Sequence, residues 1–183
     1  HVSFPELRTN LEPKEWGLVA QLLASDAPRV RAKASNALFS FRKHGRDSAG
    51  FLAQIGVLAE RYLTTPLNAP FSADEQTATS MAIGTFKSLI SDANISTQVR
   101  REALFSYSSS FARGLVPIKT MLPLLKQLFL DSHLATDAYG YMVQNKKALN
   151  ITDDQLCSFG LYAHSQTARG IALSLLVQNN ADE

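Results

Sequence analysis

The stretch SDAPRVRAKASNAL, from Ser25 to Leu38, decides the fold class that this sequence predicts. It opens with Ser-Asp-Ala-Pro, a composition typical of a turn, and continues into residues that favour helix. Its apolar residues Val30, Ala34 and Leu38 recur every four residues, the spacing of one helix face. The stretch therefore predicts a turn followed by an amphipathic helix.

The same helical period extends over most of the chain. It recurs in the stretches PKEWGLVAQLLAS, GFLAQIGVLAERYL, SADEQTATSMAIGTFKSLI, QVRREALFSYSSSFARG and SQTARGIALSLLVQNN. The proline-containing segment TTPLNAPF predicts a loop, and no window shows the alternation typical of strands. We predict an all-α fold with eight or nine helices. Residues 1–183 are expected to form one domain, and the start at His1 predicts a piece of a longer protein.

Local signals predict where several helices begin and end. Ser72 and Glu75 have the spacing of a capping box, and Ser96 or Thr97 and Ser165 or Thr167 are expected to cap later helices. Gly114 is expected to end a helix, and Pro123 predicts a kink or a helix start near Thr120. The apolar face of the helix after Ser72 is expected to contain Ala78, Met81, Ala82, Phe86 and Leu89.

Composition excludes several classes of protein. The 183 residues are 45% hydrophobic and 19% charged, which is typical of a globular domain. With one cysteine, Cys157, the chain cannot form an intramolecular disulfide. No apolar run is long enough for a membrane span. The formal net charge of +2 does not by itself indicate bulk nucleic acid as a partner. A cytoplasmic location fits the cysteine usage, but the sequence does not fix the compartment.

Two stretches of the chain share an order of parts. SDAPRVRAKASNALFSF and SDANISTQVRREALFSYSSSF each contain Ser-Asp-Ala, a turn and a Val-Arg pair, at 30–31 and at 99–100. Ala34 corresponds to Ala103 in the same comparison, and QTARGIALSLL is a weaker echo near the C-terminus. Small residues at matching positions let adjacent helices approach closely. A repeated helical unit that neighbours must cover is therefore expected.

The first of these stretches resembles a HEAT repeat. LVAQLLASDAPRVRAKASNALFSF has a leucine-rich first helix, Asp26 in the turn, and Arg31 at the start of the second helix. The resemblance is good over about residues 16–41 and partial over 88–111, where NIST is inserted before the arginine. It implies an α-solenoid or an irregular HEAT-like stack of antiparallel helices. It also implies that Asp26 and Arg31 support the stacking between repeats, and Asp26 is a candidate helix cap.

The sequence contains no recognisable catalytic or metal-binding motif. The four histidines, His1, His44, His133 and His164, lack metal-ligand spacing. Cys157 lies at an apolar-face spacing and is expected in the core. The pair Asp153-Asp154 is explained by a helix N-terminus. The serines of SYSSS, at 106–110, are expected to form a close helix contact, with a polar groove as the alternative. We therefore expect no catalytic residues, cofactor or metal.

The strongest remaining functional signal is a run of cations. We call the following residues the basic strip: Arg29, Lys33, Arg42, Lys43 and Arg46, extended by Arg101 if the second copy stacks as expected. We interpret the chain as a non-catalytic scaffold that presents this strip to a protein partner with an acidic segment. The alternative is a HEAT-like nucleic-acid-binding module that uses residues 29–46. A HEAT-like enzyme, or a function located elsewhere in a larger chain, also stays open.

Overall fold

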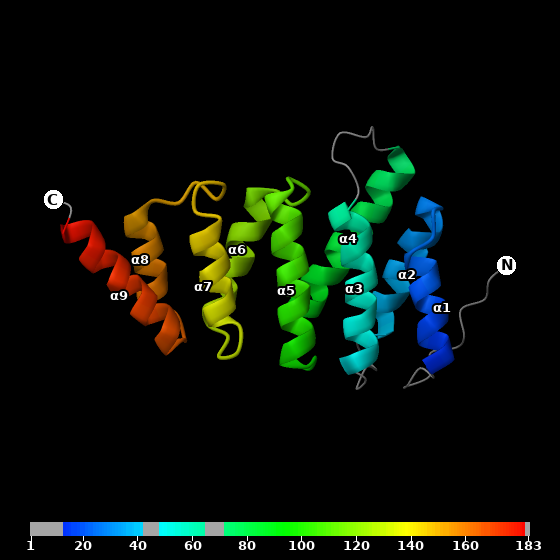
Figure 1. Ribbon diagram of the computed structural model, residues 1–183, viewed down its shortest axis with the longest axis horizontal. Helices are drawn as coiled ribbons and strands as arrows, with labels where there is room; N and C mark the ends of the chain where they lie inside the picture. The colour runs from blue at the N-terminus through cyan, green and yellow to red at the C-terminus, as the bar shows by residue number, and fades with distance from the viewer. Residues whose placement is uncertain (1–12, 42–47, 65–71, 182–183) are drawn as a thin grey trace. The chain divides into compact units, whose positions relative to one another are not determined.

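The computed structural model of the protein describes residues 13–41, 48–64 and 72–181 (Figure 1). Nine helices account for most of these residues, and no strand occurs among them. Their bounds are α1 (Pro13–Leu23), α2 (Pro28–Phe41), α3 (Ser48–Thr64), α4 (Ala73–Ser91), α5 (Thr97–Ala112), α6 (Ile118–Leu128), α7 (Ala135–Gln144), α8 (Asp153–Leu161) and α9 (Gln166–Ala181). The all-α prediction is confirmed for the described ranges.

The helices belong to two compact units, His1–Ser110 and Phe111–Glu183. In the first unit, α1 packs against α2 and α3, and the most extensive helix contact joins α2 to α4. In the second unit, α7 contacts α6, α8 and α9, and α8 packs along α9. The expectation of one domain over residues 1–183 stays a prediction.

Most of the predicted apolar-face positions described in the first unit are buried, although Val30 is only half-buried. Fully or almost fully buried residues include Val19, Leu23, Ala34, Leu38, Ile55, Leu58, Ala78, Ala82, Phe86 and Leu89. Met81 was expected on the same face, but its side chain is 36% exposed. The prediction for Met81 is wrong because α2 packs only against one side of α4, and Met81 lies at the edge of that contact.

Helix ends follow the predicted caps only in part. Ser72 caps α4 by accepting a hydrogen bond from the Glu75 amide, but the Glu75 side chain contacts Arg31, so only half of the capping box forms. Thr152 and Gln155 form a complete capping box at α8 that the sequence analysis missed. Gly114 follows the end of α5 and has a φ of 77°. Glycine adopts this left-handed conformation without steric strain, which explains why a glycine stands here.

The predicted start of α9 is confirmed, and the predicted start of α6 is corrected. The Ser165 hydroxyl accepts a hydrogen bond from the Ala168 amide at 3.1 Å, so Ser165 caps α9 as predicted. Helix α6 begins at Ile118, not near Thr120, and it contains Pro123. A proline inside the second turn removes one backbone donor from the helix.

Three arginines occupy the same place in three different helices. Arg31, Arg100 and Arg169 are each the fourth residue of their helix, in α2, α5 and α9. Each donates a hydrogen bond to a backbone carbonyl before its own helix: Ser25 at 2.6 Å, Ile90 at 2.9 Å and Ala163 at 2.7 Å, respectively. Three residues further on, Ala34, Ala103 and Ala172 are completely buried. An arginine at the same position thus ties α2, α5 and α9 each to the segment that precedes it.

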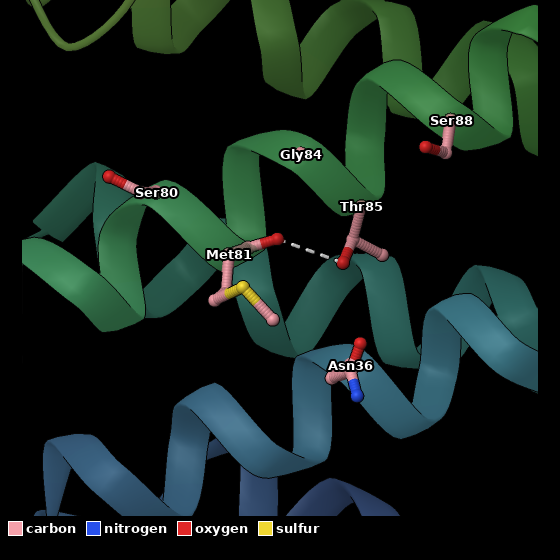
Figure 2. A pocket seen from close by; sticks show the side chains of 6 residues that line it. All are labelled: Asn36, Ser80, Met81, Gly84, Thr85 and Ser88. Carbon is pink, nitrogen blue, oxygen red and sulfur yellow. Dashed lines mark hydrogen bonds between the residues drawn. The ribbon is translucent and has the colours of Figure 1, made fainter.

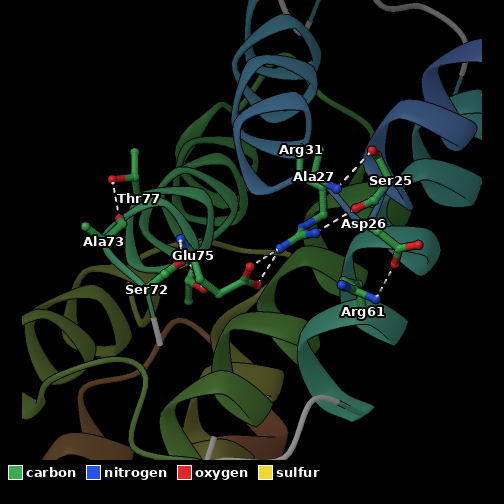
Figure 3. Close-up of polar contacts among 10 residues, drawn as sticks. Ser25, Asp26, Ala27, Arg31, Arg61, Ser72, Ala73, Glu75 and Thr77 are labelled. Atoms are coloured by element: carbon green, nitrogen blue, oxygen red, sulfur yellow. Dashed lines mark hydrogen bonds and ion pairs between the residues drawn. The ribbon is translucent and has the colours of Figure 1, made fainter. Parts of the chain in front are cut away.

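The first of these arginines also joins two helices (Figure 3). The Arg31 side chain is completely buried, and its Nη2 hydrogen-bonds both carboxylate oxygens of Glu75 at the start of α4. Asp26 does not have the predicted capping role, because its side chain is fully exposed and lies 3.6 Å from Arg61 Nη1. The hydroxyl of Ser25 accepts a hydrogen bond from the amide of Ala27, which precedes α2. Arg31 therefore has a structural role, and Asp26 does not cap α2.

We predict that Arg31→Met lowers the free energy of unfolding by about 3 kcal/mol, because it leaves the Glu75 carboxylate without its buried partner. The control is Arg29→Met, two residues away. Arg29 pairs with Asp74 at 2.9 Å, but its side chain is 81% exposed, so a loss of about 0.5 kcal/mol or less is expected. Urea unfolding followed by circular dichroism measures both values, and equal losses would contradict the assigned role of Arg31.

We also predict opposite effects for two glycine-to-alanine changes in the second unit. A Cβ at Gly160 would lie 2.5 Å from the Ala172 Cβ and 2.6 Å from the Tyr139 ring, so Gly160→Ala should destabilise by about 1–3 kcal/mol. A Cβ at Gly140, inside α7, meets nothing within 4 Å. Gly140→Ala should therefore stabilise by about 0.5–1 kcal/mol. Thermal unfolding checks both, and a neutral Gly160→Ala would show that α8 and α9 pack less closely.

Candidate functional site

The structure describes three of the six residues of the basic strip. Arg29 and Lys33 lie one turn apart on α2, and both are exposed to solvent. Arg101 is exposed on α5. The other three, Arg42, Lys43 and Arg46, lie outside the described residues. The continuity of the strip from α2 to Arg101 stays a prediction.

The positive charge of α2 is partly balanced by acidic residues of α4. Arg29 Nε lies 2.9 Å from Asp74 Oδ2, and the buried Arg31 is paired with Glu75. Both acids are in the first turn of α4, where the helix dipole also favours negative charge. The positive potential along α2 is therefore weaker than the number of cations in the sequence indicates.

A pocket of about 280 Å³ lies between α2 and α4 (Figure 2). It is lined by Asn36 from α2 and by Ser80, Met81, Gly84, Thr85 and Ser88 from α4. The Thr85 hydroxyl is 2.9 Å from the Met81 carbonyl oxygen and 3.1 Å from the Ser35 carbonyl oxygen, so it connects the two helices. None of the six lining residues has a charged side chain, so they provide no acid, base or strong nucleophile. The pocket fits a neutral group.

Small residues on α4 leave the space for this pocket. Ser80, Gly84 and Ser88 recur every four residues, and a Cβ added at Gly84 would meet nothing within 4 Å. Met81 is exposed at the same place. The pocket was not predicted from the sequence, because the helical period placed Met81 in the core. The spacing of Ser80, Gly84 and Ser88 was the signal that could have indicated it.

Cys157 belongs to the core of the second unit. It is almost fully buried, and burial raises the pKa of its thiol above the ordinary value of 9.0, with Asp153 and Asp154 acting in the same direction. The neighbouring Tyr139 hydroxyl donates a hydrogen bond to the Leu156 carbonyl at 3.1 Å, and burial raises the pKa of Tyr139 to about 12. A thiol that keeps its proton is a poor nucleophile. The expectation that Cys157 packs in the core is confirmed.

The remaining candidates for chemistry are the histidines and the serine stretch at 106–110. His133 and His164 are exposed, while His1 and His44 lie outside the described residues. In the part of the chain that the structure describes, no three histidine, cysteine, aspartate or glutamate side chains gather into a metal-binding group. Ser106, Ser108 and Ser110 are buried. The serine stretch therefore forms a close packing surface rather than an open groove.

Comparisons with known proteins add no assignment. No family model matches the chain, and no match was found among the curated proteins or the solved structures. Within the described residues, none of the helices has the length and apolar character needed to cross a membrane. The description of the site therefore rests on the chain's own geometry.

We predict that the stability of the protein falls as the pH rises above about 9. The folded state holds the protons of Cys157 and Tyr139 more tightly than the unfolded state, because both pKa values are raised. Their stabilisation is complete below the unfolded pKa values. This stabilisation is lost in two steps as the pH rises. The thiol of the unfolded chain ionises first, and the phenol of the unfolded chain ionises near pH 10. Urea unfolding between pH 7 and about 11 measures this decline.

The matched control for this prediction is Cys157→Ala, which removes the thiol and keeps a small apolar side chain. The part of the decline that begins near pH 9 should be smaller in this variant, while the part due to Tyr139 remains. An identical pH profile in both proteins would show that the thiol contributes nothing to the dependence of stability on pH.

Proposed function

We propose that this protein is a non-catalytic interaction module, a HEAT-like helical stack that holds a protein partner. The observation that carries the proposal is the repeated arginine at positions 31, 100 and 169. In each case the guanidinium contacts a carbonyl before its helix, and a buried alanine follows three residues later. A motif that recurs with the same contacts supports a fold assembled from similar helical units.

Such a fold suits binding better than catalysis. Stacked helical units offer an extended surface, and partners are held by many modest contacts. The pocket between α2 and α4 has no titratable lining residue, and Cys157 is buried. These features support a role as a scaffold or adaptor.

The basic strip is the proposed contact surface, and an acidic segment of a protein is the proposed partner. Arg29, Lys33 and Arg101 are exposed, which makes them accessible to such a segment. Arg42, Lys43 and Arg46 would continue the strip in sequence. Burial of Arg31 and pairing of Arg29 with Asp74 reduce the charge available for a dense polyanion. This favours a protein segment over nucleic acid.

The proposal predicts that charge reversal on the strip weakens binding to an acidic peptide. The double variant Arg42→Glu with Lys43→Glu should bind a fluorescein-labelled peptide of alternating glutamate and leucine about tenfold more weakly than the original chain, because like charges then face each other. The control is Lys147→Glu, an exposed lysine outside the strip. Fluorescence anisotropy at low and at high salt measures the affinities.

Two results would count against this function. An affinity that is the same in the original chain and the double variant would remove the strip as the contact surface. A duplex DNA oligonucleotide that binds more tightly than the peptide, with an affinity that falls steeply and log-linearly with salt, would favour the nucleic-acid alternative. Circular dichroism of each variant confirms that the helical fold is retained.

A further inference from the structure

The pocket between α2 and α4 is open to solvent and has no charged group inside it (Figure 2). Among the residues that line it, Asn36, Ser80 and Gly84 are exposed, and Met81 is 36% exposed. Thr85 is only 2% exposed, and its hydroxyl already hydrogen-bonds within the protein. An apolar group that enters the pocket therefore does not leave this buried hydroxyl without a partner.

The size of the pocket suits a single side chain. Its volume of about 280 Å³ lies just below the roughly 300 Å³ at which pockets for whole small-molecule ligands begin. Met81 lines it, and a thioether side chain adapts its shape to different apolar partners. At Gly84 an added Cβ would meet nothing within 4 Å, so a side chain of another molecule can approach the α4 backbone. The pocket thus fits one apolar side chain better than a cofactor.

The two helices beside the pocket carry more positive than negative charge. Helices α2 and α4 contain four arginines and lysines but two acids, Asp74 and Glu75. Both acids are paired with arginines of α2. The remaining cations, Lys33 and Lys87, are exposed, and neither has an acidic partner among the described residues. The two lysines therefore provide a surplus of positive charge that a binding partner can balance.

Each of these lysines lies one helical turn from a residue that lines the pocket. Lys33 precedes Asn36 by three residues on α2, and Lys87 follows Gly84 by three residues on α4. Residues at this spacing are neighbours on one side of a helix. A neutral pocket is thus flanked by a cation on each helix. This arrangement is complementary to an apolar side chain that has carboxylates as its neighbours.

We propose that the pocket between α2 and α4 receives an apolar side chain of the acidic partner segment, while carboxylates on either side of it face Lys33 and Lys87. This inference rests on the proposed function and narrows the partner to a segment that mixes acidic and apolar residues. Attraction to the exposed lysines guides the segment and is screened by salt. The apolar side chain adds affinity that salt does not screen, because it leaves water. A phosphate backbone offers the charge but no such side chain.

Filling the pocket tests the proposal. Gly84→Leu places a side chain in the pocket without changing the charge, and leucine favours helix more than glycine does, so the fold should be retained. The labelled peptide of alternating glutamate and leucine should bind this variant about tenfold more weakly, because the contact loses one buried apolar side chain. A peptide of the same length with serine in place of leucine should bind the variant and the original chain equally. Fluorescence anisotropy measures the affinities.

Two further variants separate the pocket from the lysines. Gly56→Leu is the matched control, because Gly56 is an exposed glycine of α3 at which an added Cβ meets nothing within 4 Å. It should bind both peptides like the original chain. Lys33→Glu should weaken the binding of both peptides by a similar factor, and this loss should shrink at high salt. The loss caused by Gly84→Leu should be the same at low and at high salt.

The methionine methyl signals locate the contact directly. Of the three methionines, Met121 and Met142 are completely buried, whereas Met81 lines the pocket. In protein that is isotope-labelled at these methyl groups, the glutamate–leucine peptide should shift the Met81 signal in the NMR spectrum and leave the other two unchanged. Met81→Leu identifies the signal by its loss. The glutamate–serine peptide should not shift it.

Other outcomes would overturn the proposal. Equal binding of the two peptides, or a Gly84→Leu variant that binds the glutamate–leucine peptide as tightly as the original chain, would contradict it. If Arg42→Glu with Lys43→Glu still weakens binding in that case, the proposed contact with an acidic segment stands and only the role of the pocket is wrong. If the original chain binds neither peptide, both proposals fail. A Met81 signal that moves with duplex DNA but not with the peptide would also overturn the proposal.

Discussion

The buried guanidinium of Arg31 is the interaction on which the described part of the first unit depends. A cation without water must have its donors paired, and here the Ser25 carbonyl and the Glu75 carboxylate accept from it. These partners lie before α2 and at the start of α4, so the pairing fixes how the two helices align. That alignment buries Ser35, leaves Met81 at the edge of the contact, and creates the pocket beside Gly84.

Local features of the fold were predictable from the sequence, because helix periodicity and caps depend on residues within a few positions. The burial of Ala78, Ala82, Phe86 and Leu89 on α4, the Ser72 and Ser165 caps and the buried Cys157 followed from such patterns. The HEAT resemblance also pointed to a structural role for Arg31. The capping role of Asp26 did not follow, because its carboxylate lies beside Arg61 of α3, a residue distant in the sequence.

Features of the candidate site that depend on distant residues were not predictable. The sequence around Arg29 contains many cations and few acids, which indicated a strong positive charge on α2. The acids that balance it, Asp74 and Glu75, come from a helix more than forty residues away. The pocket depends in the same way on how α2 and α4 align. Arg42, Lys43 and Arg46 remain known from sequence alone, and for the strip the structure shows only that Arg29, Lys33 and Arg101 are exposed.

The same helical motif leads to different surfaces in α2 and α9. Two residues after the repeated arginine, α2 exposes Lys33, whereas α9 has the partly exposed Ile171. Four residues after it, Ser35 is covered by α4, whereas Leu173 is open. The arginine and the following alanine maintain the contact within each unit and leave the remaining faces free to vary. A charged face selects partners by electrostatic complementarity, while an uncharged one selects by shape. One repeated motif can therefore carry surfaces of different chemistry.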